Sequence, residues 1–422
     1  MNRASARSLI VTAILALPAA TTLAQTPAQK VSPPEAQAWI DLATYSGFGI
    51  GGIGSLAGGS GGGGAMAMLG GMLGNATVLN TNRFGNTTTG VSGRWMDVTL
   101  AVRQQPALAD ATLAVPQGSG LAPVLKLVSP KAAPVKPTPR VEDEREVEPH
   151  TMDKPKGKVS LYWGCGDDVR PGQPRTVDFA TALPQDMMQI FNGRRATQHG
   201  THSAAGQPLW PSEADSRMVP ANATLAGEMA FAGNGVPESF RFTLPPAQDL
   251  MPPLDLQQAD AGGATRLTWA VLPTARGYFF AAMGSRKGEE SHMVIWTSSE
   301  LPDSGFGLID YQTNNAVERW LKDKVLLTPS TTSCTVPKGV FNGEGAMLRA
   351  IAYGSELNLA HPPRPTDPKV PWDPEWAVKV RLKSVTTAML GMDAGGGKRD
   401  KPAADEGKKP SKLDLLRGIL GR

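Results

Sequence analysis

Two cysteines are the residues of this 422-residue sequence whose type most directly indicates chemistry. In an oxidising compartment Cys165 and Cys334 would form one disulfide, closing a loop of roughly 170 residues. Otherwise they would be two buried thiols, or one of them would be reactive. A cysteine nucleophile needs a neighbouring base, and the linear sequence offers none beside Cys165. The disulfide is the first expectation, and the thiol alternatives stay open because the sequence does not show whether the two Cα atoms lie within bonding distance. The absence of a CxxC motif argues against thioredoxin-like redox chemistry.

A metal site could be built from His199 and His202, which are three residues apart, with Asp167 or Asp168 as a further ligand. Gly200 and the Ser, Ala and Gly residues that follow disfavour the helix that would place both imidazoles together, and no HEXXH motif is present. The two aspartates could also shape a small polar pocket or a calcium site, but a turn explains them more simply. We expect a solvated loop, with no metal and no cofactor.

Signals for hydrolytic enzymes are weak. There is no G-x-S-x-G motif, so a serine of the α/β-hydrolase kind is not supported. A pair of glycosidase carboxylates would be adjacent only in space, and with 38 acidic residues the sequence alone does not identify it. A secreted hydrolase therefore stays open as an alternative without assigned residues.

Tryptophans in proline-rich segments are the remaining candidates for ligand contact. Trp210 lies in Leu-Trp-Pro, Trp372 lies in Pro-Trp-Asp-Pro, and Trp376 follows closely. Indole rings held in rigid loops can stack on sugars or peptides. The same rings could instead fill the core or anchor loops.

The first 24 residues predict export. Arg3 and Arg7 precede an apolar run over residues 9–20, and the segment ends in Thr-Leu-Ala, which predicts signal cleavage between Ala24 and Gln25. The apolar run is too short for a permanent membrane anchor. We expect a periplasmic or extracellular location.

Composition points to a β-rich protein with a nearly neutral body. Glycine and proline are abundant, at 47 and 36 residues, and the formal net charge of +4 falls once the signal peptide is removed. Most of the remaining positive excess lies after residue 393. No basic face large enough for nucleic acid is expected.

The predicted mature chain begins with residues 25–91, in which a short helix over residues 33–45 precedes a Gly- and Met-rich arm over residues 47–74. The arm is either flexible or a glycine zipper that associates with a membrane or forms oligomers. Residues 92–250 form a first antiparallel β domain, with a Pro- and charge-rich loop over residues 131–158. Alternating runs on both sides of Gly233-Asn234-Gly235 predict a hairpin there.

Residues 251–392 form the second predicted β domain. A Leu-x-Trp strand ending at Trp269, a turn with proline and alanine, and Gly-Tyr at Tyr278 resemble the B–C region of fibronectin type III sandwiches. The resemblance covers residues 252–385, and it implies that this tryptophan and tyrosine pack between two sheets. A helical insert over residues 311–327 departs from that family. The resemblance implies a fold and no function.

Residues 393–422 form a basic low-complexity tail with a short amphipathic end. The resulting expectation is a mainly β, exported, non-catalytic binding or structural protein. Its partners would be envelope proteins or polysaccharide, with peripheral membrane contact through the arm or the C-terminal end. A hydrolase of polysaccharide or peptidoglycan and a membrane-associating or oligomerising protein are the alternatives.

Overall fold

A computed structural model describes residues 29–47, 82–131, 157–183, 185, 193–194, 200–286, 288–341 and 345–390. The predicted signal peptide with its cleavage site at Ala24 and Gln25, most of the Gly-rich arm, most of the loop over residues 131–158, His199 and the C-terminal tail lie outside these residues.

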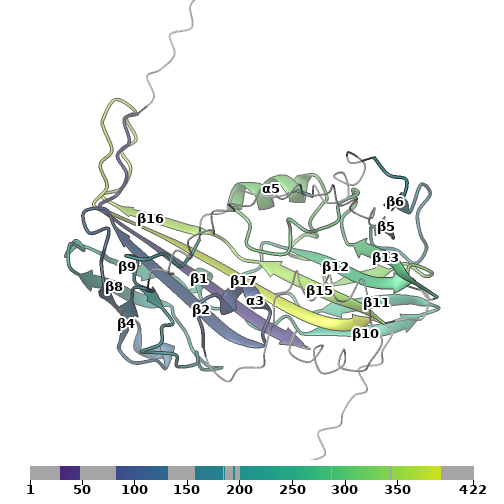
Figure 1. Cartoon of the computed structure of the whole chain (residues 1–422), viewed down its shortest axis with the longest axis horizontal. Helices are drawn as coiled ribbons and strands as arrows, with labels where there is room; N and C mark the ends of the chain where they lie inside the picture. The colour runs from purple at the N-terminus through teal and green to yellow at the C-terminus, as the bar shows by residue number, and fades with distance from the viewer. Residues whose placement is uncertain are drawn as a thin grey trace, which may run out of the picture.

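The described chain is mainly β, as predicted, and its strands form two sheets (Figure 1). The strands are β1 (Ala36–Gly47), β2 (Gly93–Val102), β3 (Asp110–Ala114), β4 (Val124–Val128), β5 (Lys158–Trp163), β6 (Arg175–Asp178), β7 (Leu209–Trp210), β8 (Gly227–Gly233), β9 (Arg241–Leu244), β10 (Leu256–Ala261), β11 (Ala264–Trp269), β12 (Gly277–Arg286), β13 (Glu289–Thr297), β14 (Ser333–Val336), β15 (Ala346–Tyr353), β16 (Leu357–His361) and β17 (Trp376–Leu390). The helices are α3 (Asn86–Thr89) and α5 (Asn314–Lys322), with 3-10 turns η1 (Gln117–Ser119) and η2 (Pro246–Gln248).

One large sheet carries 14 strands in the order β6-β5-β13-β12-β15-β17-β1-β2-β7-β4-β3-β8-β9, with β16 paired to β17. The second sheet is β10-β11-β14. The pairing is mostly antiparallel, as predicted, and two pairs are parallel, β1 with β17 and β5 with β13. These pairs join segments far apart in the chain, and parallel neighbours need such long connections. Sheet pairing thus crosses the predicted boundary at residue 250, and the division into two domains stays a prediction.

The predicted helix over residues 33–45 is wrong, because this segment forms strand β1. Its apolar residues Ala36, Ala38, Ile40 and Leu42 also fit a period of two, and all four are fully buried. β1 pairs with β17 along its whole length and with β2 from Ala36 to Tyr45, so pairing with neighbours on both sides overrides the local helical pattern.

Each face of the central strands packs against a different layer. Ile40 and Leu42 of β1 belong to the main core, to which the second sheet contributes Leu267 and Trp269. On the opposite face, Ala43 and Tyr45 belong to a second core that includes Trp320 and the other buried residues of α5. Figure 1 shows α5 lying over the large sheet. The predicted helical insert is therefore confirmed, and it closes one face of the sheet.

The two aromatic residues that carry the fibronectin-like resemblance pack as it implies. Trp269 lies on β11 of the small sheet, Tyr278 lies on β12 of the large sheet, and their ring centroids are 5.5 Å apart. Both side chains are buried. The arrangement is that of a β-sandwich, in which aromatic side chains from two sheets meet.

Among the described residues, neither helix is long and apolar enough to cross a membrane.

Candidate functional site

The predicted disulfide is present. Cys165 and Cys334 are bonded, with their Cα atoms 5.2 Å apart. The bond joins the turn after β5 to β14 of the small sheet, and the backbone N–H of Gly166 donates to the Thr335 carbonyl over 2.9 Å beside it. It acts as a structural cross-link, and no reactive cysteine remains.

Only one of the three predicted ligand-contact tryptophans lies near the surface. Trp210 is fully buried in β7, where Val98 of β2 pairs with it. Trp376 is 6% exposed and stacks on Phe240 with ring centroids 4.8 Å apart. The prediction is wrong for these two, because both rings fill the core between strands. Trp372 is half-buried, with the Arg364 guanidinium 5.5 Å from its ring centroid, so it alone stays a candidate.

The predicted turn residues make structural contacts. His202 Nδ1 lies 3.0 Å from the Gly200 carbonyl oxygen, and its ring meets the Trp39 ring edge-on. Asp168 forms an ion pair of 2.7 Å with Lys338, and the Asp167 carbonyl accepts from the Lys338 backbone N–H. The described residues contain no group of three His, Cys, Asp or Glu side chains that could hold a metal ion.

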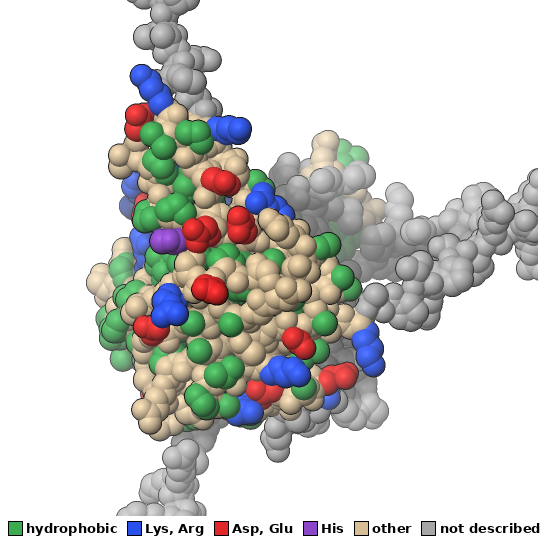
Figure 2. Space-filling model, turned by 90° about the vertical axis from the view of Figure 1, so that its left-hand side faces the viewer, with side chains coloured by type: hydrophobic (Ala, Val, Ile, Leu, Met, Phe, Trp, Pro, Cys, Tyr) green, Lys and Arg blue, Asp and Glu red, His purple; other side chains and the backbone are tan. Residues whose placement is uncertain are grey.

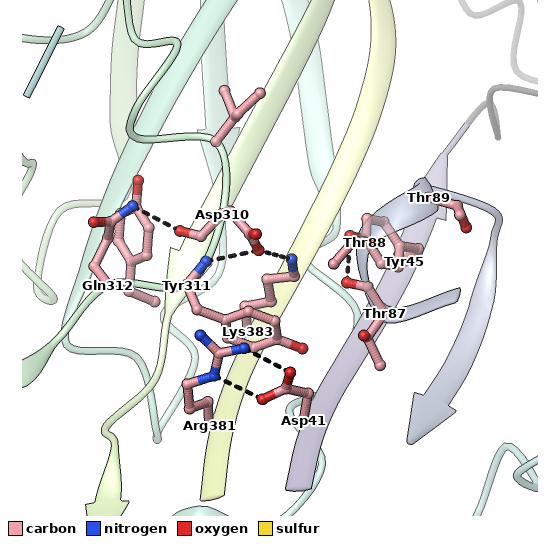
Figure 3. Close-up of polar contacts among 12 residues, drawn as sticks. Asp41, Tyr45, Thr87, Thr88, Thr89, Asp310, Tyr311, Gln312, Arg381 and Lys383 are labelled. Atoms are coloured by element: carbon pink, nitrogen blue, oxygen red, sulfur yellow. Dashed lines mark hydrogen bonds and ion pairs between the residues drawn. The ribbon is translucent and has the colours of Figure 1, made fainter. Parts of the chain in front are cut away.

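The densest set of charges lies where β17, β1 and β2 run side by side (Figure 3). Arg381 and Asp41 are partners across the β17–β1 pairing, and Asp41 is in turn opposite Asp97 of β2. Arg381 Nε and Nη2 each donate to one oxygen of Asp41 over 2.6 Å. Thr201 donates its backbone N–H and its hydroxyl to Oδ2 of the same carboxylate, over 3.1 and 2.6 Å. Such a bidentate pair is both strong and geometrically specific.

The loop that covers this pair depends on a glycine. A Cβ atom at Gly200 would lie 1.6 Å from Arg381 Nη2, so only glycine permits the backbone to come this close. Arg381 and Asp41 are 7% and 2% exposed. The Asp41 charge and hydrogen bonds hold the pKa of Arg381 above its ordinary value although burial acts to lower it.

Tyr311 separates Arg381 from a second buried cation. Its ring centroid is 4.3 Å from the Arg381 guanidinium carbon and 4.0 Å from Lys383 Nζ, and its hydroxyl donates to the Leu42 carbonyl over 2.9 Å. Lys383 Nζ also contacts Asp310 Oδ1 at 2.5 Å. Burial would raise the pKa of Asp310, but the Lys383 ammonium holds it below its ordinary value. The ring and carboxylate together stabilise a lysine that is 1% exposed.

Asp97 has a different environment from Asp41. Its Oδ2 accepts from the Gly85 and Thr87 backbone N–H groups and from the Thr87 hydroxyl, while its Oδ1 is buried without a partner among the described residues. Burial, together with the nearby Asp41 charge, raises the pKa of Asp97 to about 7 despite those hydrogen bonds. No cation among the described residues pairs with this carboxyl group, and burial of this kind favours the neutral form of an acid.

This buried charge cluster can support the fold but offers no route for a substrate. Asp41 and Asp97 are neighbouring carboxyl groups, the pattern that a glycosidase uses, yet they are 2% and 1% exposed. Asp41 is also fully engaged by Arg381 and Thr201. We therefore interpret the cluster as an internal connection between strands β17, β1 and β2.

Replacing Asp97 by asparagine should change how stability depends on pH. The folded-state pKa of Asp97 is about 7 and its ordinary value is 3.8, so the native state binds this proton more tightly. Its stabilising contribution is complete below pH 3.8 and is lost as pH rises towards 7. We expect the stability of Asp97→Asn relative to wild type to rise across that window, by up to about 1.4 kcal/mol per pH unit. Urea midpoints of both proteins measured across this range check it, and a constant difference would contradict it.

Sequence reasoning missed a serine–histidine–carboxylate chain at one edge of the large sheet. Ser160 Oγ of β5 lies 2.8 Å from His292 Nε2, and His292 Nδ1 lies 3.0 Å from Glu289 Oε2 on β13. Glu289 is the acceptor, so Nδ1 carries a proton and neutral His292 can accept the Ser160 proton at Nε2. That is the order of groups in a nucleophilic serine triad. Ser160 is 1% exposed and also contacts Thr176 at 2.9 Å.

No motif could have identified this chain, because Ser160 and His292 are 132 residues apart and meet through the parallel β5–β13 pairing. Only the spacing of Glu289 and His292, which are three residues apart, is visible in the sequence.

Comparisons with known proteins give no family for this chain. No protein-family model matches it, and no curated protein sequence matches it. The fibronectin type III resemblance therefore stays a prediction, and the fold class defined here is a mainly β, sandwich-like protein with one disulfide.

Proposed function

We propose that this protein is an exported, non-catalytic binding protein of the cell envelope or of the secreted fraction, with a fibronectin-like second half. The signal-like residues 1–24 and the Cys165–Cys334 disulfide support an oxidising compartment. Its role is to hold a ligand on a rigid β framework. The packing of Trp269 against Tyr278 supports the fibronectin-like part of the proposal.

The observation that carries the binding function is a pair of surface pockets, each lined by a residue whose buried polar atom has no hydrogen-bond partner among the described residues. One pocket, of about 440 Å³, lies between the start of β1 and the end of β2, and Gln207 lines it. The other, of about 330 Å³, is lined by Ser304. Gln207 Oε1 and Ser304 Oγ are both buried and have no hydrogen-bond partner among the described residues. Leaving such atoms unpaired costs free energy that a bound ligand would recover.

The face shown in Figure 2 also supports partners other than nucleic acid. Figure 2 shows the end of the molecule at the left of Figure 1, where acidic, basic and hydrophobic side chains are interspersed. Neither charge gathers into a broad patch on that face. Binding to a nucleic-acid backbone needs a continuous basic stripe.

A second candidate function is hydrolysis, and the Ser160–His292–Glu289 chain is the observation that favours it. In this alternative the Ser160 oxygen would attack an ester or amide carbon of a polysaccharide substituent or of peptidoglycan, while His292 takes the serine proton and passes it to the leaving group. Glu289 would orient the imidazole. The buried position of Ser160 favours the non-catalytic proposal. The third alternative, membrane association or oligomerisation through the Gly-rich arm, concerns residues outside those described.

A fluorophosphonate, which forms a covalent adduct with activated serines, separates the two functions. We expect the purified protein to show no adduct by intact mass, because Ser160 is buried and bonded to Thr176 as well as His292. An adduct at Ser160 that disappears in His292→Ala would contradict the proposal and establish the hydrolase. Ser384→Ala is the matched control, since Ser384 is another buried serine, bonded to the Pro252 carbonyl.

A further inference from the structure

The pocket lined by Ser304 has a mostly polar surface that carries positive charge, with Leu161 and Pro302 as its apolar lining residues. Its lining residues are Leu161, Arg175, Gly193, Arg194, Pro302, Asp303 and Ser304. Leu161 and Arg175 are register partners on β5 and β6, at the edge of the large sheet, so both side chains lie on the same face. The loop that follows β13 supplies residues 302–304.

Asp303 holds one of the two arginines in place. Its side chain is 1% exposed, and Oδ2 accepts from the Arg194 backbone N–H over 3.1 Å and from Arg194 Nη1 over 2.9 Å. The other oxygen, Oδ1, accepts from the Gly305 backbone N–H over 2.8 Å. Both oxygens of Asp303 are therefore occupied, and the remaining N–H groups of Arg194 have no partner among the described residues. A guanidinium fixed on one side in this way can still donate from the other.

Arg175 supplies a second guanidinium that is free to bind. It is exposed and forms no ion pair among the described residues. With Arg194 and Asp303 it gives the pocket a net charge of about +1, which matches a monoanion.

Ser304 supplies a neutral donor in the same pocket. The residue is 4% exposed, and its hydroxyl has no hydrogen-bond partner in the part of the chain that the structure describes. Leaving a buried hydroxyl without a hydrogen bond costs about 1–3 kcal/mol of stability. We therefore expect a ligand atom to accept a hydrogen bond from this hydroxyl. An oxygen atom of an anion would accept from Ser304 and from a guanidinium together.

We propose that this pocket binds a small monocarboxylate with a short apolar body. The carboxylate would lie between Arg175, Arg194 and the Ser304 hydroxyl, and the apolar body would lie against Leu161 and Pro302. A planar carboxylate matches the fork of a guanidinium, and the pocket volume of about 330 Å³ is at the small end of ligand sites. This inference deepens the proposed binding function by giving it a site and a ligand class.

Isothermal titration of the purified full chain with butyrate, butanamide and inorganic phosphate tests the assignment. We expect butyrate to bind with a dissociation constant on the order of 1 mM, and the neutral isostere butanamide and phosphate to bind at least about tenfold more weakly. Equal heats from butyrate and butanamide, or no butyrate binding at roughly 10 mM, would overturn the proposal. Tighter binding of phosphate than of butyrate would overturn the carboxylate assignment.

Two variants assign the binding to this pocket. Arg175→Gln should weaken butyrate binding by roughly tenfold without changing thermal stability, because Arg175 is exposed and forms no ion pair with the residues that the structure describes. Ser304→Ala should weaken binding by roughly fivefold while leaving stability unchanged or higher, since it removes a buried hydroxyl that no described residue satisfies. Arg241→Gln is the matched control, an exposed arginine on β9 at the opposite edge of the sheet. Wild-type affinity in Arg175→Gln would overturn the site. The titration uses purified protein and does not depend on export. A negative result would therefore overturn the assigned pocket and leave the proposal of export untouched.

Discussion

Replacing Arg381 by methionine is expected to lower the free energy of unfolding by about 3–5 kcal/mol. Arg381 donates both hydrogen bonds of its pair with Asp41, and Asp41 is 2% exposed. The variant leaves a buried carboxylate with only Thr201 to stabilise it, and it also removes the cation above the Tyr311 ring. Urea unfolding of wild type and variant measures the loss, with both curves fitted to the same dependence of the free energy of unfolding on urea concentration.

The physical reason is tested by restoring charge balance. Asp41→Leu combined with Arg381→Met removes both charges, and replacing a buried pair by apolar side chains is frequently neutral, so we expect the double variant to recover most of the loss. Arg266→Met is the control, because Arg266 is exposed on β11, and its effect should stay within about 0.5 kcal/mol. A loss of less than about 1 kcal/mol in Arg381→Met would contradict the role of the pair.

Removing the disulfide with Cys165→Ala and Cys334→Ala together is expected to destabilise the protein by up to about 4–5 kcal/mol. The bond closes a loop with a sequence separation of 169 residues, so its loss frees a large part of the unfolded chain. It also joins the turn after β5 to the small sheet, which otherwise contacts that turn through hydrogen bonds such as Gly166 to Thr335. Denaturant midpoints with and without dithiothreitol measure the effect.

The state of the two thiols also tests export. The double alanine variant should be insensitive to dithiothreitol, whereas wild type should be destabilised by it. When the chain is expressed with residues 1–24, the exported fraction should contain no titratable thiol, and a chain lacking those residues should stay in the cytoplasm with both thiols reduced. Equal stability of oxidised and reduced wild type would contradict the stabilising role. Reduced protein confined to the cytoplasm would contradict export.

Strands with clear alternation or turn signals could be predicted closely. The alternating runs on both sides of Gly233-Asn234-Gly235 form the hairpin of β8 and β9, as predicted, and the predicted helical insert contains α5. In these segments local pattern and tertiary environment agree. Residues 33–45 show the opposite case, because alanines spaced through β1 satisfy both a helical and a strand period, and pairing with β17 and β2 decided between them.

The candidate sites were not predictable in the same way. Trp210 and Trp372 both neighbour proline in the sequence, yet one is fully buried and the other is half-buried. Local sequence carries no information on which strand covers a ring. The arginines at 175 and 194 and the serine at 304 likewise have no shared motif, and they meet because β6, the segment at residues 193–194 and the loop after β13 converge at one sheet edge.

By itself, the sequence determined the mainly β class, the hairpin of β8 and β9 and the helical insert, because these follow from local periodicity and turn chemistry. Only the tertiary structure decided the parallel pairings, the buried Asp41–Arg381 pair, the Ser160–His292–Glu289 chain and the arginine pocket. Each of these joins residues more than 100 positions apart. Their proximity depends on strand order and register, which long-range packing sets and no local pattern encodes.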